Sequence, residues 1–175
     1  MIFTPIPIAG AFLVALEPRE DRRGSFARAF CKREFAQQGI DFDIAQCNLA
    51  RTTAAGVVRG LHFQAPPAEE RKLVRCVVGA VFDALVDMRP SSPTRRKVFH
   101  VRLDSDQGQA VFVPSGVAHG YQALENGTTV LYMTDQYYAP GLELGVRYSD
   151  PAVAIPWPLE ARDVADRDKD WPLLD

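Results

Sequence analysis

The sequence predicts an all-β fold, with the jelly roll as the leading architecture. Short runs rich in Val, Phe, Leu and Tyr follow one another along the chain, with 12 Gly and 13 Pro scattered between them. Many short strands with frequent turns are typical of a β-sandwich or barrel, and double-sheet jelly rolls are a common form of it. A length of 175 residues without a low-complexity linker predicts one domain over residues 1–175.

The strands are expected where apolar and β-branched residues cluster between turn formers. The first run ends before the charged stretch that begins at Glu17. Two helical pieces are expected: Lys32–Gln38, which Gly39 would end, and a turn or two in the charged tail Glu160–Asp170. In chain order, the predicted strands are Phe12–Leu16, Phe26–Phe30, Ile44–Ala50, Val57–Phe63, Leu73–Val78, Val81–Asp87, Val98–Leu103, Ala110–Val113, Tyr121–Leu124 and Val130–Asp135.

Strand alternation places three polar side chains on otherwise apolar faces. Residues two apart in a strand share a face. A polar group that is buried without a partner costs several kcal/mol, so these side chains are expected to be satisfied by hydrogen bonds or used in function. Lys72 shares its face with Val74, Cys76 and Val78, His62 with Val58 and Gln64, and Tyr132 with Val130 and Thr134.

Composition excludes several classes of protein. Twenty Lys+Arg against 22 Asp+Glu give a net charge of −2, without the basic excess of a nucleic-acid-binding protein. The apolar stretch Ile8–Leu16 is too short for a membrane span and lacks the basic leader of a signal peptide. An odd set of three cysteines, Cys31, Cys47 and Cys76, predicts buried reduced thiols. We therefore expect a cytoplasmic protein that binds neither nucleic acid nor membrane.

The histidines are not expected to form a metal site. The segment Pro114-Ser115-Gly116-Val117-Ala118-His119 resembles the second motif of cupins, in which a Pro-x-Gly turn precedes a histidine. Metal-binding cupins also carry a His-x-His pair, but here the matching residues read His62-Phe63-Gln64. A metal site needs three or four protein ligands, and His100 has no ligand spacing, so a structural role is expected for it. The sequence thus predicts no metal and no cofactor.

Four motifs occur in a specific order along the chain: RGLHFQ at 59–64, KLVRC at 72–76, VDMRPSSPT at 86–94 and GVAHG at 116–120. Together they resemble the dTDP-4-dehydrorhamnose 3,5-epimerase family, and the resemblance runs from about Asp21 to Pro172. It implies a cupin-type jelly roll (a double-stranded β-helix) with a few short helices. It also implies a metal-independent homodimer that epimerises a nucleotide-linked 4-keto-6-deoxy sugar.

The implied reaction needs particular residue types. A ketone at carbon 4 acidifies the protons on carbons 3 and 5, so inversion requires a base, an acid on the opposite face and a positive charge near the enolate oxygen. The resemblance assigns these roles to His62, Tyr132 and Lys72. An imidazole (ordinary pKa about 6.5) can accept a proton near neutral pH, whereas a phenol (about 10) still holds one. Asp168 is implied as the carboxylate that orients the base.

The resemblance also implies how the substrate is bound. A pyrophosphate calls for forked cationic donors, and arginines match the family at two such positions. One of them, Arg23, lies on an N-terminal segment that family dimers exchange between subunits. The implied substrate-binding residues are Arg23, Gln46, Asn48, Arg59, His119, Tyr138, Glu143 and Arg167.

The spacing of Arg59 and His62 predicts a local irregularity. The two residues are three apart, so a regular strand would point them to opposite faces. Both can face one pocket if the strand is interrupted, and Gly60 between them is typical of a bulge.

Departures from the family pattern keep alternatives open. The family has Glu two residues after the Phe of its Asp-x-Arg-Gly-x-Phe element, but here Phe26 is followed by Ala27 and Arg28. This change of sign bears on which nucleotide carries the sugar. The alternatives are an epimerase acting at carbon 3 only or on a different nucleotide sugar, a non-catalytic sugar-binding cupin, and a metal-dependent cupin oxygenase or isomerase.

Overall fold

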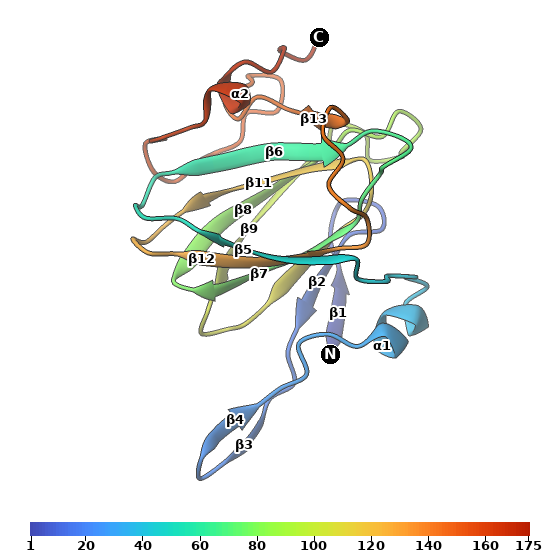
Figure 1. Cartoon of the computed structure of the whole chain (residues 1–175), viewed down its shortest axis with the longest axis vertical. Coiled ribbons are helices and arrows are strands. Elements are labelled where there is room, and N and C mark those ends of the chain that lie inside the picture. Colours follow the sequence, from blue (N-terminus) through green and yellow to red (C-terminus); the bar gives the residue numbers. More distant parts are fainter.

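Two antiparallel sheets face each other in the computed structural model, which describes residues 1–175 (Figure 1). The six-stranded sheet has the order β1-β2-β10-β7-β12-β5 and the five-stranded sheet the order β13-β6-β11-β8-β9. This all-β jelly roll is the predicted fold class. The elements are β1 Ile2–Pro5, β2 Phe12–Ala15, β3 Arg19–Asp21, β4 Gly24–Phe26, α1 Lys32–Gln37, β5 Gln46–Arg51, β6 Val58–Gln64, β7 Lys72–Val78, β8 Ala80–Asp87, β9 Val98–Asp104, β10 Ala110–Val113, β11 Val117–Ala123, β12 Thr129–Thr134, β13 Glu143–Gly145 and α2 Asp166–Lys169.

The main core lies between the two sheets. Val74 and Cys76 of β7 pack there with Leu85 of β8, Val111 of β10 and Val130 of β12. This apolar layer occupies one part of the interior. The polar side chains on the same inward faces, among them His62, Lys72 and Tyr132, lie between the sheets beside this apolar layer.

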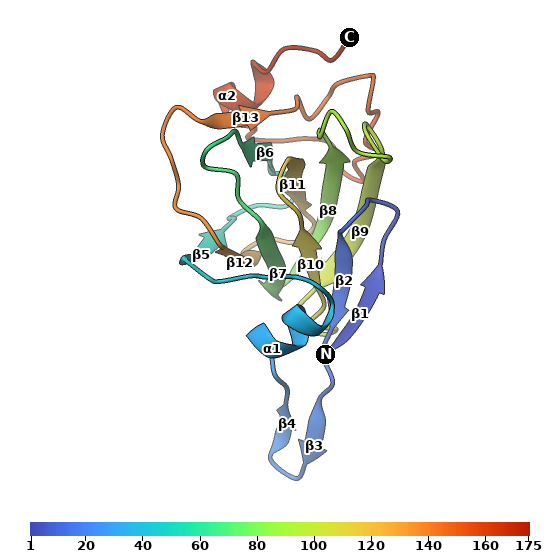
Figure 2. The ribbon, with the colours of Figure 1, turned by 90° about the vertical axis from the view of Figure 1, so that its right-hand side faces the viewer.

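Two further apolar clusters attach other segments to the outer faces of the sheets. Under α1, Phe35 packs with Phe42 and Phe112 against the six-stranded sheet. On the other layer, Leu61 of β6 packs with Ile155 of the C-terminal region. The second cluster holds the C-terminal region against β6, and α2 contacts the same strand (Figure 2).

Two of the predicted strands need correction. The expected strand Phe26–Phe30 is wrong: Phe26 ends β4, and the chain then runs without a strand to α1. The expected strand Tyr121–Leu124 is only the second part of β11, which begins at Val117 and includes His119. The sequence interpretation also missed β1, β3 and β13, which are three or four residues long. The helix at Lys32–Gln37 and a turn of helix in the charged tail are confirmed.

The cysteines and one face of β7 also differ from expectation. Only Cys76 is buried, while Cys31 is half-buried and Cys47 is exposed on the edge strand β5; all three are free. Burial raises the pKa of the Cys76 thiol to about 11.

Val78 does not continue the inward face of Cys76. The pairing of β7 with β12 shifts register between Thr129 and Val130, and Val78 is exposed.

No helix of the chain is both long and apolar enough to span a membrane. The β3–β4 hairpin projects away from both sheets in the two views of the molecule (Figures 1 and 2).

Candidate active site

A cavity of about 660 Å³ opens between the two sheets. Its walls come from β5, β7 and β12 of one sheet, β6, β11 and β13 of the other, and the C-terminal segment. Of the residues predicted to form the site, all but Arg23 line it. They are Gln46, Asn48, Arg59, His62, Lys72, His119, Tyr132, Tyr138, Glu143, Arg167 and Asp168.

His62 and Asp168 form a close pair at the edge of the cavity. His62 Nε2 lies 2.5 Å from Asp168 Oδ1, and the other carboxylate oxygen accepts the backbone N–H of Gly60 at 3.1 Å. Burial by itself would raise the pKa of Asp168, but the hydrogen bond and charge of His62, the Gly60 N–H and the charge of Arg167 together outweigh it and lower that pKa below its ordinary value. The carboxylate is therefore ionised at neutral pH. It fixes the Nε2 proton and leaves Nδ1 free to accept one.

Glu143 lies on the other side of the imidazole. Its carboxylate is 3.8 Å from His62 Nδ1 and 2.9 Å from Arg167 Nη1. β13 pairs with β6 so that Glu143 lies opposite Gln64 and Gly145 opposite His62. The imidazole thus stands between two carboxylates, an arrangement that stabilises the ring once it is protonated.

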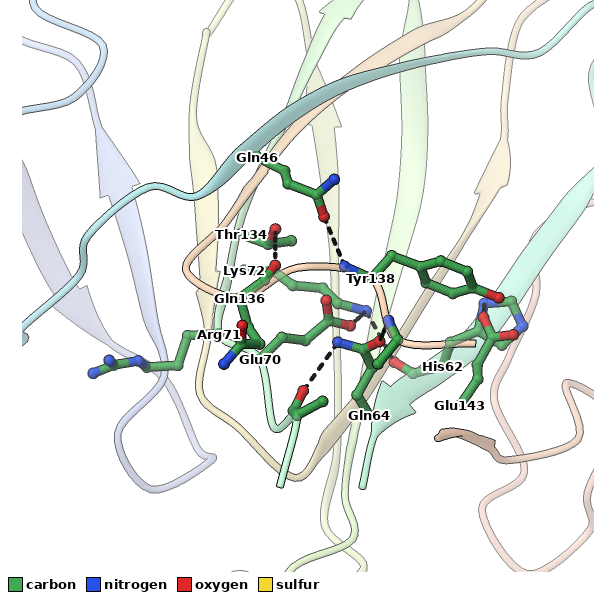
Figure 3. A network of polar contacts seen from close by, with 12 residues as sticks. Gln46, His62, Gln64, Glu70, Arg71, Lys72, Thr134, Gln136, Tyr138 and Glu143 are labelled. Carbon is green, nitrogen blue, oxygen red and sulfur yellow. Dashed lines mark hydrogen bonds and ion pairs between the residues drawn. The ribbon is translucent and has the colours of Figure 1, made fainter. Parts of the chain in front are cut away.

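Lys72 and Tyr132 belong to the opposite sheet. Lys72 Nζ donates to the backbone carbonyl of His62 at 3.2 Å and lies 2.9 Å from Glu70 Oε1 (Figure 3). Burial raises the pKa of the Tyr132 phenol, and the negative charge of Glu70 raises it further. Tyr132 therefore keeps its proton well into the alkaline range. Because His62 belongs to β6 and Tyr132 to β12, the two side chains enter the cavity from different sheets.

His119 is held by a buried carboxylate. Its Nε2 is 2.8 Å from Asp83 Oδ2 on the neighbouring strand β8. Burial raises the pKa of Asp83, and the contact with His119 opposes that rise. The second oxygen, Asp83 Oδ1, is buried without a hydrogen-bond partner.

The predicted irregularity at Gly60 is confirmed. The pairing of β6 with β11 shifts register, so that His62 lies opposite His119 and Arg59 opposite Tyr121. Three steps along β6 thus match two along β11, which brings Arg59 and His62 to the same cavity. Arg59 Nε then donates to Thr52 Oγ1 at 3.3 Å.

Two glutamines hold the segment that carries Tyr138. Gln46 Oε1 accepts the backbone N–H of Tyr138 at 2.8 Å, and Gln64 Oε1 accepts that of Ala139 at 2.7 Å (Figure 3). Gln64 also donates to the carbonyl of Tyr137 at 3.2 Å. Gln46, predicted to bind substrate, therefore also positions the backbone of another predicted binding residue.

Arg23 lies outside the cavity. It sits at the tip of the β3–β4 hairpin, where its side chain pairs with Asp21 at 2.6 Å. Phe26 of the same hairpin is 75% exposed. Within a single chain, the hairpin has no contact with the site.

The sequence interpretation missed three polar residues: Glu70, Asp83 and Gln64. Asp83 carries a signal that could have been followed, since it is a lone acid within the apolar strand Ala80–Asp87. Glu70 precedes its strand in a charged stretch, and nothing in that stretch separates it from Glu69.

The sequence matches one family model, dTDP-4-dehydrorhamnose 3,5-epimerase, over residues 5–175. It is 37% identical over 158 residues to the dTDP-4-dehydrorhamnose 3,5-epimerase of Sinorhizobium fredii, and the match covers 90% of this chain and 81% of the relative. It is 38% identical over 175 residues to the dTDP-4-dehydrorhamnose 3-epimerase of Streptomyces niveus, covering 99% and 84% of the two chains.

A solved structure shares the whole architecture. The crystal structure of dTDP-4-dehydrorhamnose 3,5-epimerase from Bacillus anthracis, with TDP and PPi bound, superposes with a TM-score of 0.95. Its sequence is 34% identical, and the match covers 99% of both chains.

Proposed function

The chain belongs to the dTDP-4-dehydrorhamnose 3,5-epimerase family, and we propose that it inverts carbon 3 and carbon 5 of dTDP-4-dehydro-6-deoxyglucose. It is an isomerase acting on a nucleotide-linked 4-keto-6-deoxy sugar. The observation that carries the proposal is that His62 and Tyr132 enter one cavity from opposite sheets. A sugar ring lying between them has a base on one face and an acid on the other.

His62 is the proposed base. Its Nδ1 takes the proton from carbon 3 or carbon 5, and the electrons of the broken C–H bond move to the ketone oxygen to form an enolate. The Asp168 carboxylate, 2.5 Å from Nε2, stabilises the imidazolium that results.

Lys72 and Tyr132 complete the proposed step. The Lys72 ammonium group stabilises the negative oxygen, and removing one such group in other enzymes costs about 2.7–4 kcal/mol. The Tyr132 hydroxyl donates its proton to the opposite face of the carbon, and the C–H bond re-forms with inverted configuration. Solvent then returns a proton to the phenolate and removes one from the imidazolium. These side chains perform the reaction without a metal or a cofactor.

The remaining cavity residues are proposed to hold the nucleotide. Arg59 and Arg167 carry the positive charge that a pyrophosphate requires. Asn48, Gln46 and His119 offer hydrogen bonds, and the ring of Tyr138, which is exposed at the cavity, offers a stacking surface for a base. The Bacillus anthracis relative, crystallised with TDP and PPi, binds ligands of this chemistry.

We further propose a cytoplasmic homodimer of single-domain subunits that exchange their N-terminal segments. The β3–β4 hairpin, with Arg23 at its tip and the exposed Phe26, supports the exchange because it projects away from both sheets of its own subunit (Figure 1). The free, exposed thiol of Cys47 fits a reducing compartment.

One alternative is specifically supported: an epimerase that acts at carbon 3 only. The Streptomyces niveus relative is a 3-epimerase and is as similar to this chain as the 3,5-epimerase of Sinorhizobium fredii. The two activities share the first proton transfer, so the His62 pair serves either.

Proton NMR in deuterated water tests the proposal. The purified protein is mixed with dTDP-4-dehydro-6-deoxyglucose, and deuterium is followed at each carbon. Deuterium at carbons 3 and 5 with the L-configured product is the expected result. Deuterium at carbon 3 alone supports the alternative, and a substrate left unchanged contradicts the proposal. A parallel sample with another nucleotide in place of dTDP tests whether Arg28, which pairs with Glu34 at 3.0 Å, accompanies a different nucleotide.

A further inference from the structure

Glu70 is a nearly buried carboxylate in the cavity whose partner is Lys72. Its side chain is 11% exposed and that of Lys72 is 12% exposed, and Oε1 lies 2.9 Å from Nζ. The same ammonium group donates to the carbonyl of His62 at 3.2 Å. Nζ is therefore held between the carboxylate of Glu70, which precedes β7, and the backbone carbonyl of His62 in the other sheet (Figure 3).

The backbone around Glu70 is firmly placed. The next residue, Arg71, donates its N–H to Asp135 Oδ1 at 2.7 Å, and its guanidinium pairs with the same carboxylate. Lys72 lies opposite Thr134 in the pairing of β7 with β12. Glu70 thus points into the cavity from a segment fixed on β12, the strand that carries Tyr132.

A buried ion pair is by itself weak evidence for a stabilising role. Burying two charges costs about as much free energy as their attraction returns, and apolar replacements of such pairs are often neutral or stabilising. The location of Glu70 points to chemistry instead, because it lines the cavity with the proposed acid and the proposed charge donor.

We propose that Glu70 is a positioning residue for the epimerisation. Its carboxylate fixes the Lys72 ammonium group beside His62, where the enolate oxygen forms, and supplies negative charge to the part of the cavity that Tyr132 lines. The inference rests on the proposed function. It adds a residue that acts through Lys72 and Tyr132 and not on the sugar itself.

Charge supports the second part of this role. The charged groups that act on the Tyr132 phenol are Glu70 and Glu143, which raise its pKa, and Arg59, which lowers it. Tyr121 is a further titratable group close enough to interact with it. Of the charged groups, Glu70 has the largest effect on the pKa of Tyr132. Removing its charge should therefore let Tyr132 ionise at lower pH.

Two variants separate the contact of Glu70 with Lys72 Nζ from the negative charge of its carboxylate. Glu70→Ala removes both and should lower kcat roughly tenfold or more, since a displaced charge no longer meets the oxygen, with a smaller change in KM. Glu70→Gln keeps an acceptor for Nζ and should recover much of kcat. In both variants the alkaline limb of the kcat profile should move to lower pH by about half a unit or more. Glu69→Gln changes the charge of the exposed neighbouring residue and serves as the control.

Ultraviolet absorbance of tyrosinate gives a readout that does not need activity. The difference between each protein and its Tyr132→Phe partner isolates the ionisation of Tyr132, which should occur at lower pH in Glu70→Gln. If the wild type is active and Glu70→Ala has the same kcat, the same KM and the same alkaline limb, the proposal is overturned. If the wild type leaves the sugar unchanged, the result counts against the proposed function. The role of Glu70 is then rejected separately if Tyr132 ionises at the same pH in Glu70→Gln as in the wild type.

Discussion

His62 and Asp168 are far apart in the sequence and meet because the C-terminal segment returns to β6. The carboxylate accepts from both the imidazole and the backbone of Gly60, so it is oriented as well as charged. At the scale of single residues, this pair gives the two ring nitrogens of His62 different partners. Asp168 contacts Nε2, and in the proposed mechanism Nδ1 takes the proton from the sugar.

Asp168→Asn should lower turnover by roughly 10² to 10⁴, because an amide can present its NH₂ group to Nε2 and favour the wrong tautomer. Asp170→Asn, an exposed position of the same segment, is the matched control. Steady-state kinetics on the two folded variants make the comparison. Equal rates for Asp168→Asn and the control would remove the pair from the mechanism.

The same carboxylate has a defined pH dependence. Its folded pKa is lowered, so its contribution to the free energy of unfolding is complete above the unfolded value of about 4 and is lost as the pH falls from there through the folded value. Acid unfolding followed by circular dichroism should therefore show Asp168→Asn losing less stability than the wild type as the pH falls below about 4.

Residues on strands were predictable from the sequence, and charge partners were not. His62, Lys72 and Tyr132 stand at positions where alternation gives an inward face, and the motifs around them identify the family. Glu70 and Asp83 gain their meaning from a contact across space, Glu70 with Lys72 and Asp83 with His119. No local pattern encodes those contacts.

At the scale of elements, β6 owes its shape to Gly60. This glycine has a φ of +111°, in the region that favours glycine. A Cβ there would lie 2.6 Å from Gly120 Cα and 2.7 Å from the His119 carbonyl oxygen. The close approach of β6 and β11 is what directs Arg59 and His62 to one cavity.

Gly60→Ala should destabilise the protein by at least about 2 kcal/mol, because neither backbone neighbour can move without breaking the sheet. Gly127→Ala is a suitable control, since its φ is +74° but nothing lies within 4 Å of the added Cβ. That variant should lose only about 1 kcal/mol. Urea unfolding measures both, and equal losses would show that the contact with β11 is unimportant.

Elements with long apolar runs were predictable, and short ones were not. The core strands β7, β8 and β10 follow from runs such as Ala110–Val113, all of which are buried. The hairpin β3–β4 consists of exposed residues. Its pairing depends on Gly24 and the Asp21–Arg23 contact, which the hydrophobic pattern does not reveal.

At the scale of the whole molecule, the two sheets place opposed chemical groups around one cavity, and the hairpin extends away from it (Figure 2). The proposed exchange of N-terminal segments would make Arg23 of one subunit part of its partner's site. The unit of activity would then be the dimer.

Mixing two impaired variants tests that arrangement. Arg23→Ala and His62→Ala homodimers should both be impaired. In a mixed dimer with exchanged hairpins, the subunit that keeps His62 receives an intact Arg23, so one site is complete. Random pairing makes half of the dimers mixed and should restore roughly a quarter of wild-type activity. No recovery after subunit exchange, with mixed dimers demonstrated by native mass spectrometry, would contradict the exchange.

The central claim is that base and acid act from opposite faces, and Tyr132→Phe tests it most directly. In deuterated water, substrate exchange and completed epimerisation are measured together for this variant and for Tyr137→Phe, whose side chain lies outside the cavity. His62 should still remove protons and return deuterium to the same face. Exchange should therefore persist within roughly threefold, while inversion falls about 10² or more. Equal losses of exchange and inversion in Tyr132→Phe would contradict the account.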